Sequence, residues 1–161
     1  MANNDLLIKL YDMNSHPLSL NENNQEITIR KPIGTDRRML INWAQKHFPD
    51  VWLSEIESAL VNTPCSCFIA QQDNSLLGFV CYDSTALGYF GPIGVVKEAR
   101  GNGIGLTLAK HCLQDMWLKG YGYAIVGMAN SPAFYQKIAP VIEIPDSDPG
   151  IYRMTNALRK S

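Results

Sequence analysis

Glycines between residues 100 and 105 give the chain a segment that could bind an anion. Arg100-Gly-Asn-Gly-Ile-Gly105 places three glycines at alternate positions, at the start of an amphipathic helix predicted over residues 103–119. Glycine permits the backbone turns that aim successive N–H groups at one point, and the helix dipole adds partial positive charge there. A plain turn needs fewer glycines, and each further one costs conformational entropy on folding. The pattern predicts a site for a phosphate or pyrophosphate.

Two common phosphate-binding patterns do not fit this loop. The Walker pattern G-x-x-x-x-G-K-[S/T] is absent. The dinucleotide pattern G-x-G-x-x-G would need its third glycine where Leu106 or Leu108 stands. The spacing that remains, from Arg100 to Gly105, is R/Q-x-x-G-x-G/A. This spacing disfavours a nucleotide-binding domain of the Rossmann type.

Strand and helix patterns around the loop predict the elements that position it. Strands are predicted at residues 26–30, 67–71, 76–83, 89–95, 123–128 and 141–145, with strand-like runs at 6–11 (an edge strand or arm) and 151–154. Helices are predicted after the capping residue Thr35 or Asp36, and at residues 51–61, 103–119 and 133–139. The apolar run Tyr123–Met128 predicts a strand buried on both faces and parallel to residues 89–95. The fold class is therefore α+β, with a mostly antiparallel sheet and one parallel step.

The loop and a second segment together carry a family resemblance. Val95-Val96, the loop Arg100–Gly105 and the helix after it resemble motif A of the GCN5-related N-acetyltransferases (GNAT). Asn130, Ala133, Phe134 and Tyr135 resemble the second half of that signature. The element order from about Ile27 to Ile144 is also similar, so the resemblance spans most of the chain. It implies a twisted, mixed, mostly antiparallel sheet with helices on both faces. Tyr89–Gly94 and Ser147–Tyr152 resemble a subgroup of the superfamily with no assigned substrate.

The resemblance implies acetyl-CoA as the co-substrate. Backbone N–H groups of the loop would hold its pyrophosphate, and Arg100 would add a charge-assisted contact. The pantetheine arm would pair with the strand before the loop as an added strand. Asn130 would contact this arm or cap the helix that follows, and Phe134 would pack beside it. The expected cofactor-binding residues are Ile93, Val95, Val96, Arg100, Gly101, Asn102, Gly103, Ile104, Gly105, Asn130 and Phe134.

The resemblance also implies a catalytic role for Tyr135. Its hydroxyl could protonate the CoA thiolate that leaves when an amine attacks the thioester. The plainer alternative is an aromatic residue packed on the sheet. The base that deprotonates the amine is not evident from the sequence: Tyr89 is a weak candidate beside Asp83, Tyr82, Glu98 and a chain of water molecules.

These roles define a leading and an alternative function. The leading function is direct transfer of acetyl from acetyl-CoA to a primary amine of an unidentified acceptor. No acyl-enzyme is expected, because Cys65, Cys67, Cys81 and Cys112 lie away from the signature. The alternative is a sensor or interaction module that binds acyl-CoA with little turnover. A homodimer is compatible with either function.

Composition limits the other classes of function. The chain has 161 residues, 46% of them hydrophobic and 18% charged, which fits one domain with an arm (1–25), a core (26–144) and a C-terminal extension (145–161). A net charge of −1 argues against a nucleic-acid-binding surface, and no apolar run is long enough to cross a membrane. The first residues lack a basic segment ahead of a long apolar run, so we expect no secretory signal and a cytoplasmic location. Cysteine and histidine spacings match no metal site, so we expect no metal and free thiols.

Overall fold

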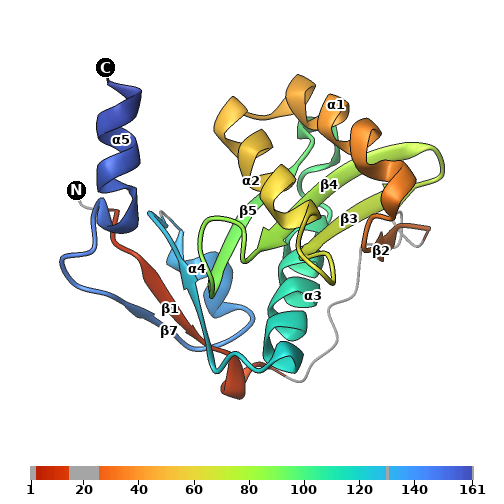
Figure 1. Ribbon diagram of the computed structural model, residues 1–161. Coiled ribbons are helices and arrows are strands. Elements are labelled where there is room, and N and C mark those ends of the chain that lie inside the picture. Colours follow the sequence, from red (N-terminus) through yellow and green to blue (C-terminus); the bar gives the residue numbers. More distant parts are fainter. Residues whose placement is uncertain (1–2, 15–25, 130, 161) are drawn as a thin grey trace.

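The fold is a single seven-stranded sheet within residues 3–14, 26–129 and 131–160, which the computed structural model describes (Figure 1). The strands are β1 (Leu6–Lys9), β2 (Thr28–Arg30), β3 (Cys67–Gln72), β4 (Ser75–Tyr82), β5 (Tyr89–Val95), β6 (Tyr123–Val126) and β7 (Val141–Glu143). Their order across the sheet is β2-β3-β4-β5-β6-β1-β7. Only β5 and β6 pair in parallel among these strands, which confirms the predicted α+β class and its one parallel step.

Helices cover both faces of the sheet, as the resemblance implied. They are α1 (Arg37–His47), α2 (Asp50–Leu60), α3 (Ile104–Lys119), α4 (Pro132–Gln136) and α5 (Arg153–Arg159). Successive side chains of a strand point to opposite faces, and the buried residues of β4 divide accordingly. Phe79 packs in a cluster with residues of α1 and α2, whereas its neighbour Val80 packs in a cluster with residues of α3 and α4. The pair α1 and α2 therefore lies on one face, and α3 and α4 lie on the other.

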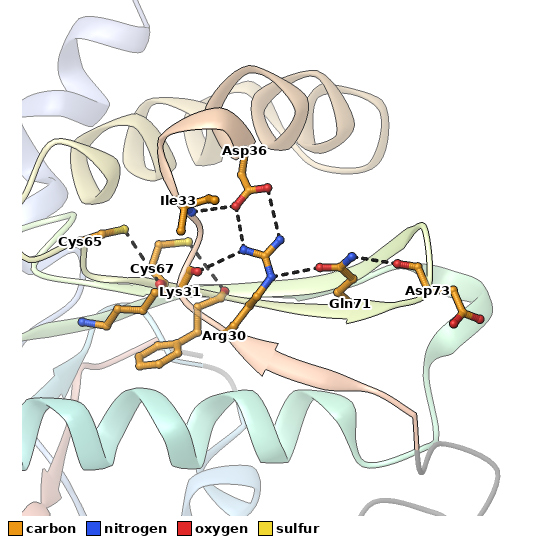
Figure 2. A network of polar contacts seen from close by, with 9 residues as sticks. Arg30, Lys31, Ile33, Asp36, Cys65, Cys67, Gln71 and Asp73 are labelled. Carbon is orange, nitrogen blue, oxygen red and sulfur yellow. Dashed lines mark hydrogen bonds and ion pairs between the residues drawn. The ribbon is translucent and has the colours of Figure 1, made fainter.

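A network of polar side chains fixes α1 to the sheet (Figure 2). Arg30 on β2 donates through Nη1 and Nη2 to the two carboxylate oxygens of Asp36, at 2.7 and 3.2 Å. Asp36 ends the 3₁₀ turn before α1 and also accepts a hydrogen bond from the Ile33 N–H at 2.7 Å. The Arg30 guanidinium, and next the Ile33 N–H, lower the pKa of Asp36. Arg30 Nε donates to Gln71 Oε1 on β3 at 3.0 Å, so the network joins two strands to the start of α1.

The expectation that residues 6–11 form an edge strand or arm was wrong. β1 lies between β6 and β7 and pairs with both, and Leu6 and Ile8 are buried. The run ends in a 3₁₀ turn, Leu10–Asp12. The alternation of buried and half-buried residues along β1 suits an inner strand, but its partners lie more than a hundred residues further along the chain. No local pattern specifies such a partner.

Two further strand predictions need correction. β6 ends at Val126, and Tyr123 at its start is 46% exposed, so this strand is not buried on both faces. Residues 151–154 form no strand, because Gly150–Tyr152 is a 3₁₀ turn that continues into α5. β7 already occupies the outer edge of the sheet beside β1.

Neither a membrane span nor a metal cluster is found in the part of the chain that the structure describes. None of its helices combines the length and hydropathy needed to cross a bilayer. No group of three or more His, Cys, Asp or Glu side chains lies close enough together to hold a metal ion.

Candidate functional site

The parallel strands β5 and β6 separate after two paired residues. Tyr89 pairs with Ile125 and Phe90 with Val126, and β5 then continues to Val95 without a partner on this side. The register of β5 against β4 also shifts at this point, where β5 has one more residue than β4. Gly91 has a φ of +109°, which only glycine adopts readily, and Pro92 has no N–H to contribute to a ladder. The local sequence thus opens the sheet at the point where its one parallel pair lies.

The open edge of β5 presents main-chain hydrogen-bonding groups. Val96 N donates to Leu77 O at 2.8 Å, on the β4 side. Main-chain groups of successive residues in a strand point to opposite sides, so those of Val95 and Ile93 point to the side of β6. Arg100 Nε donates a hydrogen bond to Val95 O at 3.0 Å, which agrees with a Val95 carbonyl that points away from β4. β5 can therefore accept an extended ligand as an additional strand.

The glycine-rich loop follows β5 directly and leads into α3. Gly101 and Gly103 have φ values of +84° and +80°, so both occupy the left-handed region that disfavours other residues. Asn102 Nδ2 donates a hydrogen bond to Ala99 O at 3.3 Å, which stabilises the turn. α3 begins at Ile104, and the first N–H groups of a helix have no acceptor within it. Those groups and the turn are the parts of the loop available to an anion.

A cleft of about 1130 Å³ lies between the separated strands and extends to both faces of the sheet. Phe134 and Tyr135 of α4 line it from the face that carries α3. Trp52 and Glu55 of α2 line it from the opposite face. The other lining residues come from α2, the β4–β5 turn, β5, the end of β6, and the C-terminal segment: Val51, Ser54, Ser84, Thr85, Phe90, Gly91, Pro92, Ile93, Val126, Gly127, Met128, Ala129, Ser131, Ile151, Tyr152, Thr155 and Arg159. Two molecules could therefore approach each other from opposite faces.

Tyr135 lies at the cleft with only 8% of its surface exposed. Two aromatic rings pack against its ring in T-shaped contacts, with ring centroids 5.5 Å away at Phe90 and 5.0 Å away at Phe134. Burial raises the pKa of Tyr135 to about 12, because a phenolate would be poorly solvated there. The hydroxyl is therefore protonated near neutral pH and can donate a proton or a hydrogen bond into the cleft.

The predicted site residues fall into three groups. Ile93, Phe134 and Tyr135 line the cleft. The residues from Val95 to Gly105 lie beside it, at the end of β5 and the start of α3. Asn130 lies outside the described residues.

None of the side chains considered as the base lines the cleft. Burial, and next the nearby Asp5 carboxylate, raises the pKa of Tyr89. The Asp83 carboxylate accepts hydrogen bonds from Lys119, Tyr121 and the Gly88 N–H. The Tyr82 hydroxyl donates to Asp115, and Glu98 is exposed in the turn after β5.

Sequence reasoning missed a polar group on the other side of the cleft. Glu55 Oε1 accepts a hydrogen bond from the Thr85 hydroxyl, and the Tyr152 hydroxyl lies close to both side chains. A partial signal existed, because Val51, Trp52 and Glu55 have the spacing of one helix face. Tyr152 has no such signal, because the pattern of residues 151–154 predicts a strand.

The comparisons with known proteins agree with this geometry. The model of the acetyltransferase (GNAT) family matches residues 36–139. Among solved structures, the GCN5-related glucosamine N-acetyltransferase region of a fungal multi-domain GH3 β-N-acetylglucosaminidase superposes with a TM-score of 0.67 at 17% identity, over 88% of this chain and 19% of that chain. A GCN5-related N-acetyltransferase from Sphaerobacter thermophilus gives a TM-score of 0.58 at 21% identity, over 95% of this chain and 46% of that chain. A GCN5-related N-acetyltransferase from Kribbella flavida gives a TM-score of 0.57 at 10% identity, over 89% of this chain and 55% of that chain.

The coverage and identity of these matches limit the conclusions that can be drawn from the solved structures. This chain spans about half or less of the length of each of these solved structures. At such identities the likeness concerns the fold. No protein with a curated description matches the chain significantly in sequence.

Proposed function

Because the chain belongs to the acetyltransferase (GNAT) family, we propose that it transfers an acetyl group from acetyl-CoA directly to a primary amine. The observation that carries this proposal is the cleft that passes through the sheet between the open edge of β5 and Tyr135. It gives the acetyl donor and the amine acceptor separate routes to one point. Proximity of this kind replaces a collision between two molecules in solution with a reaction between bound neighbours.

The main chain around the loop has the groups that acetyl-CoA needs. The N–H and C=O groups of Ile93 and the N–H of Val95 suit the amides of the pantetheine arm, which would lie beside β5 as a strand, whereas the Val95 C=O already accepts a hydrogen bond from Arg100 Nε. The N–H groups from Gly101 to Gly105 suit the pyrophosphate, and Arg100 supplies a nearby positive charge. Bound there, acetyl-CoA supplies an activated acetyl group as a thioester.

Tyr135 takes the role of general acid. The attacking amine must lose a proton, and its nitrogen forms a bond to the acetyl carbonyl carbon while the carbon–sulfur bond breaks. The Tyr135 hydroxyl donates its proton, or a strong hydrogen bond, to the sulfur as negative charge develops there. Its raised pKa keeps the hydroxyl protonated until that moment.

The cysteines favour direct transfer over an acyl-enzyme. All four lie in the described residues, and none of them lines the cleft. Burial raises the pKa values of the Cys65, Cys81 and Cys112 thiols, which reduces the thiolate needed for attack. With radiolabelled acetyl-CoA alone, we expect no label that survives denaturation; stable stoichiometric label would contradict direct transfer.

An amine panel separates this function from an acyl-CoA-binding module. The release of CoA thiol is measured with acetyl-CoA and alkylamines, a peptide with a free N-terminus, and glucosamine, the last because of the glucosamine N-acetyltransferase region among the similar structures. We expect amine-dependent thiol release together with an acetylated product. Binding of acetyl-CoA without amine-dependent release would favour a sensor or interaction module instead.

A further inference from the structure

A carboxylate without a cationic partner lies at the cleft on the face opposite Tyr135. Glu55 is half-buried on α2, and among the described residues no Lys, Arg or His forms an ion pair with it. The ion pairs in the described part of the chain are Arg30–Asp36, Lys31–Asp115 and Lys119–Asp83. One carboxylate oxygen, Oε1, accepts the hydrogen bond from Thr85. A half-buried carboxylate is most stable beside a positive charge, which a ligand could supply.

Two hydroxyl groups lie beside this carboxylate. Thr85 is in the turn between β4 and β5, and its hydroxyl donates to Glu55 Oε1. The Tyr152 hydroxyl lies close to both Thr85 and Glu55. Tyr152 reaches the cleft because residue 127 is glycine: a Cβ there would lie 2.8 Å from the Tyr152 ring and its hydroxyl. Ser84 donates to the main-chain carbonyl of Glu55, which holds this turn against α2. The carboxylate and the two hydroxyls are thus held together by α2, the β4–β5 turn and the C-terminal segment.

The rest of the cleft near α2 is poor in charge, and its apolar side chains lie beside the hydroxyl-bearing residues Ser54 and Thr155. Side chains of Val51, Trp52 and Ile151 line it together with the polar group. Glu55 is the one acidic residue among the described residues that line the cleft, and Arg159 is the one basic residue. If the acceptor had several positive charges, only one of them could pair with the Glu55 carboxylate. The others would lie unpaired in the same cleft as the positive charge of Arg159.

We propose that Glu55, Thr85 and Tyr152 bind the ammonium group of the acceptor, and that the acceptor is a monoamine with an apolar or aromatic body. This inference rests on the proposed acetyl transfer. Glu55 accepts the proton that the ammonium loses before its nitrogen bonds to the acetyl carbon, and later releases this proton to solvent. As the amide forms, the nitrogen loses a second proton through solvent in the open cleft, which restores the Tyr135 hydroxyl after it has protonated the sulfur. Trp52 and Ile151 contact the apolar body. The sulfur that leaves takes its proton from Tyr135, on the opposite face of the sheet.

Calorimetric titration of the CoA-loaded protein with 2-phenylethylamine and its neutral analogue 2-phenylethanol tests this subsite. We expect the amine to bind more tightly than the alcohol. Glu55→Gln keeps the size of the side chain and an oxygen for Thr85, and should weaken amine binding about 10- to 100-fold while leaving the alcohol unchanged. Tyr152→Phe should weaken amine binding by a smaller factor. Glu57→Gln is the matched control, because Glu57 is exposed on the same helix and does not line the cleft.

The outcomes separate this subsite from the proposed function. Equal amine affinity in the wild type and Glu55→Gln, or no binding of 2-phenylethylamine to the wild type, overturns the subsite. In the thiol-release assay we expect 2-phenylethylamine to be a better acceptor than spermidine or glucosamine; the reverse order contradicts the substrate class but leaves acetyl transfer intact. Absence of CoA binding, or of thiol release with every amine, refutes the proposed function itself.

Discussion

Phe90 and Val126 are the last paired residues of the parallel strands β5 and β6. Beyond this pair the sheet opens, and both residues line the cleft that reaches its two faces. Phe90 also packs against Tyr135 in a T-shaped contact, with ring centroids 5.5 Å apart. The point where the sheet divides therefore also positions the hydroxyl proposed as the acid.

Replacing Tyr135 with Phe tests its role as the acid. The change keeps the ring that packs against Phe90 and Phe134 and removes the hydroxyl. We expect turnover to fall about 100-fold or more, as is typical when a general acid is lost, with nearly unchanged affinity for acetyl-CoA. Thiol release with an accepted amine gives the turnover, and calorimetry gives the affinity. Unchanged turnover would assign Tyr135 a packing role only.

Replacing Gly103 with Ala tests the anion-binding loop. The residue has a φ of +80°, which costs a residue with a Cβ about 1–2 kcal/mol, so the loop must distort or the protein lose that much stability. We expect weaker acetyl-CoA binding in calorimetry and a lower unfolding midpoint. Gly122→Ala is the control, because Gly122 has no positive φ and its Cβ would meet no neighbouring atom within 4 Å. Equal acetyl-CoA affinity in the two variants would contradict the assigned role of the loop.

Local sequence patterns indicate a site only on the side of the cleft proposed for the acetyl donor. Arg100–Gly105 and Tyr135 belong to local sequence patterns. In the loop, a turn with positive φ before a helix requires glycines close together in the sequence. The place of β1 depends on pairing with β6 and β7, which no local pattern encodes. The acceptor side depends on three segments that meet only in the folded chain. Glu55 therefore has only the partial signal of its place on one helix face, and the pattern around Tyr152 predicts a strand that does not form.

The Arg30–Asp36 contact should make stability depend on acidic pH. The pKa of Asp36 is lowered in the folded protein, so its contribution is present above the ordinary carboxyl range and is lost as pH falls through the folded-state value. At pH 7 we expect Asp36→Asn to lower the free energy of unfolding by about 1–2 kcal/mol, allowing for the partly exposed Arg30. Urea unfolding should show this difference shrinking below about pH 4. A difference that does not depend on pH would contradict the ion pair.

Alkaline pH should destabilise the protein through Tyr135. Its pKa is raised from 10.0 to about 12, so the folded state holds the proton more tightly than the unfolded state. The contribution of the protonated Tyr135 to the free energy of unfolding is complete below pH 10. As pH rises from 10 to 12, this free energy falls by about 2–3 kcal/mol. Tyr82 and Tyr121 act in the same direction, so the measurement compares the wild type with Tyr135→Phe in urea at matched pH. The variant should lose less stability above pH 10; identical slopes would contradict the buried phenol.

Binding of acetyl-CoA to the wild-type protein tests the central claim most directly. In a calorimetric titration we expect saturable binding of one acetyl-CoA per chain, and we expect free CoA to compete for it through the same loop and β5 edge. A titration with no saturable heat, confirmed by equilibrium dialysis with radiolabelled acetyl-CoA, would contradict the assignment of this cleft to acetyl transfer.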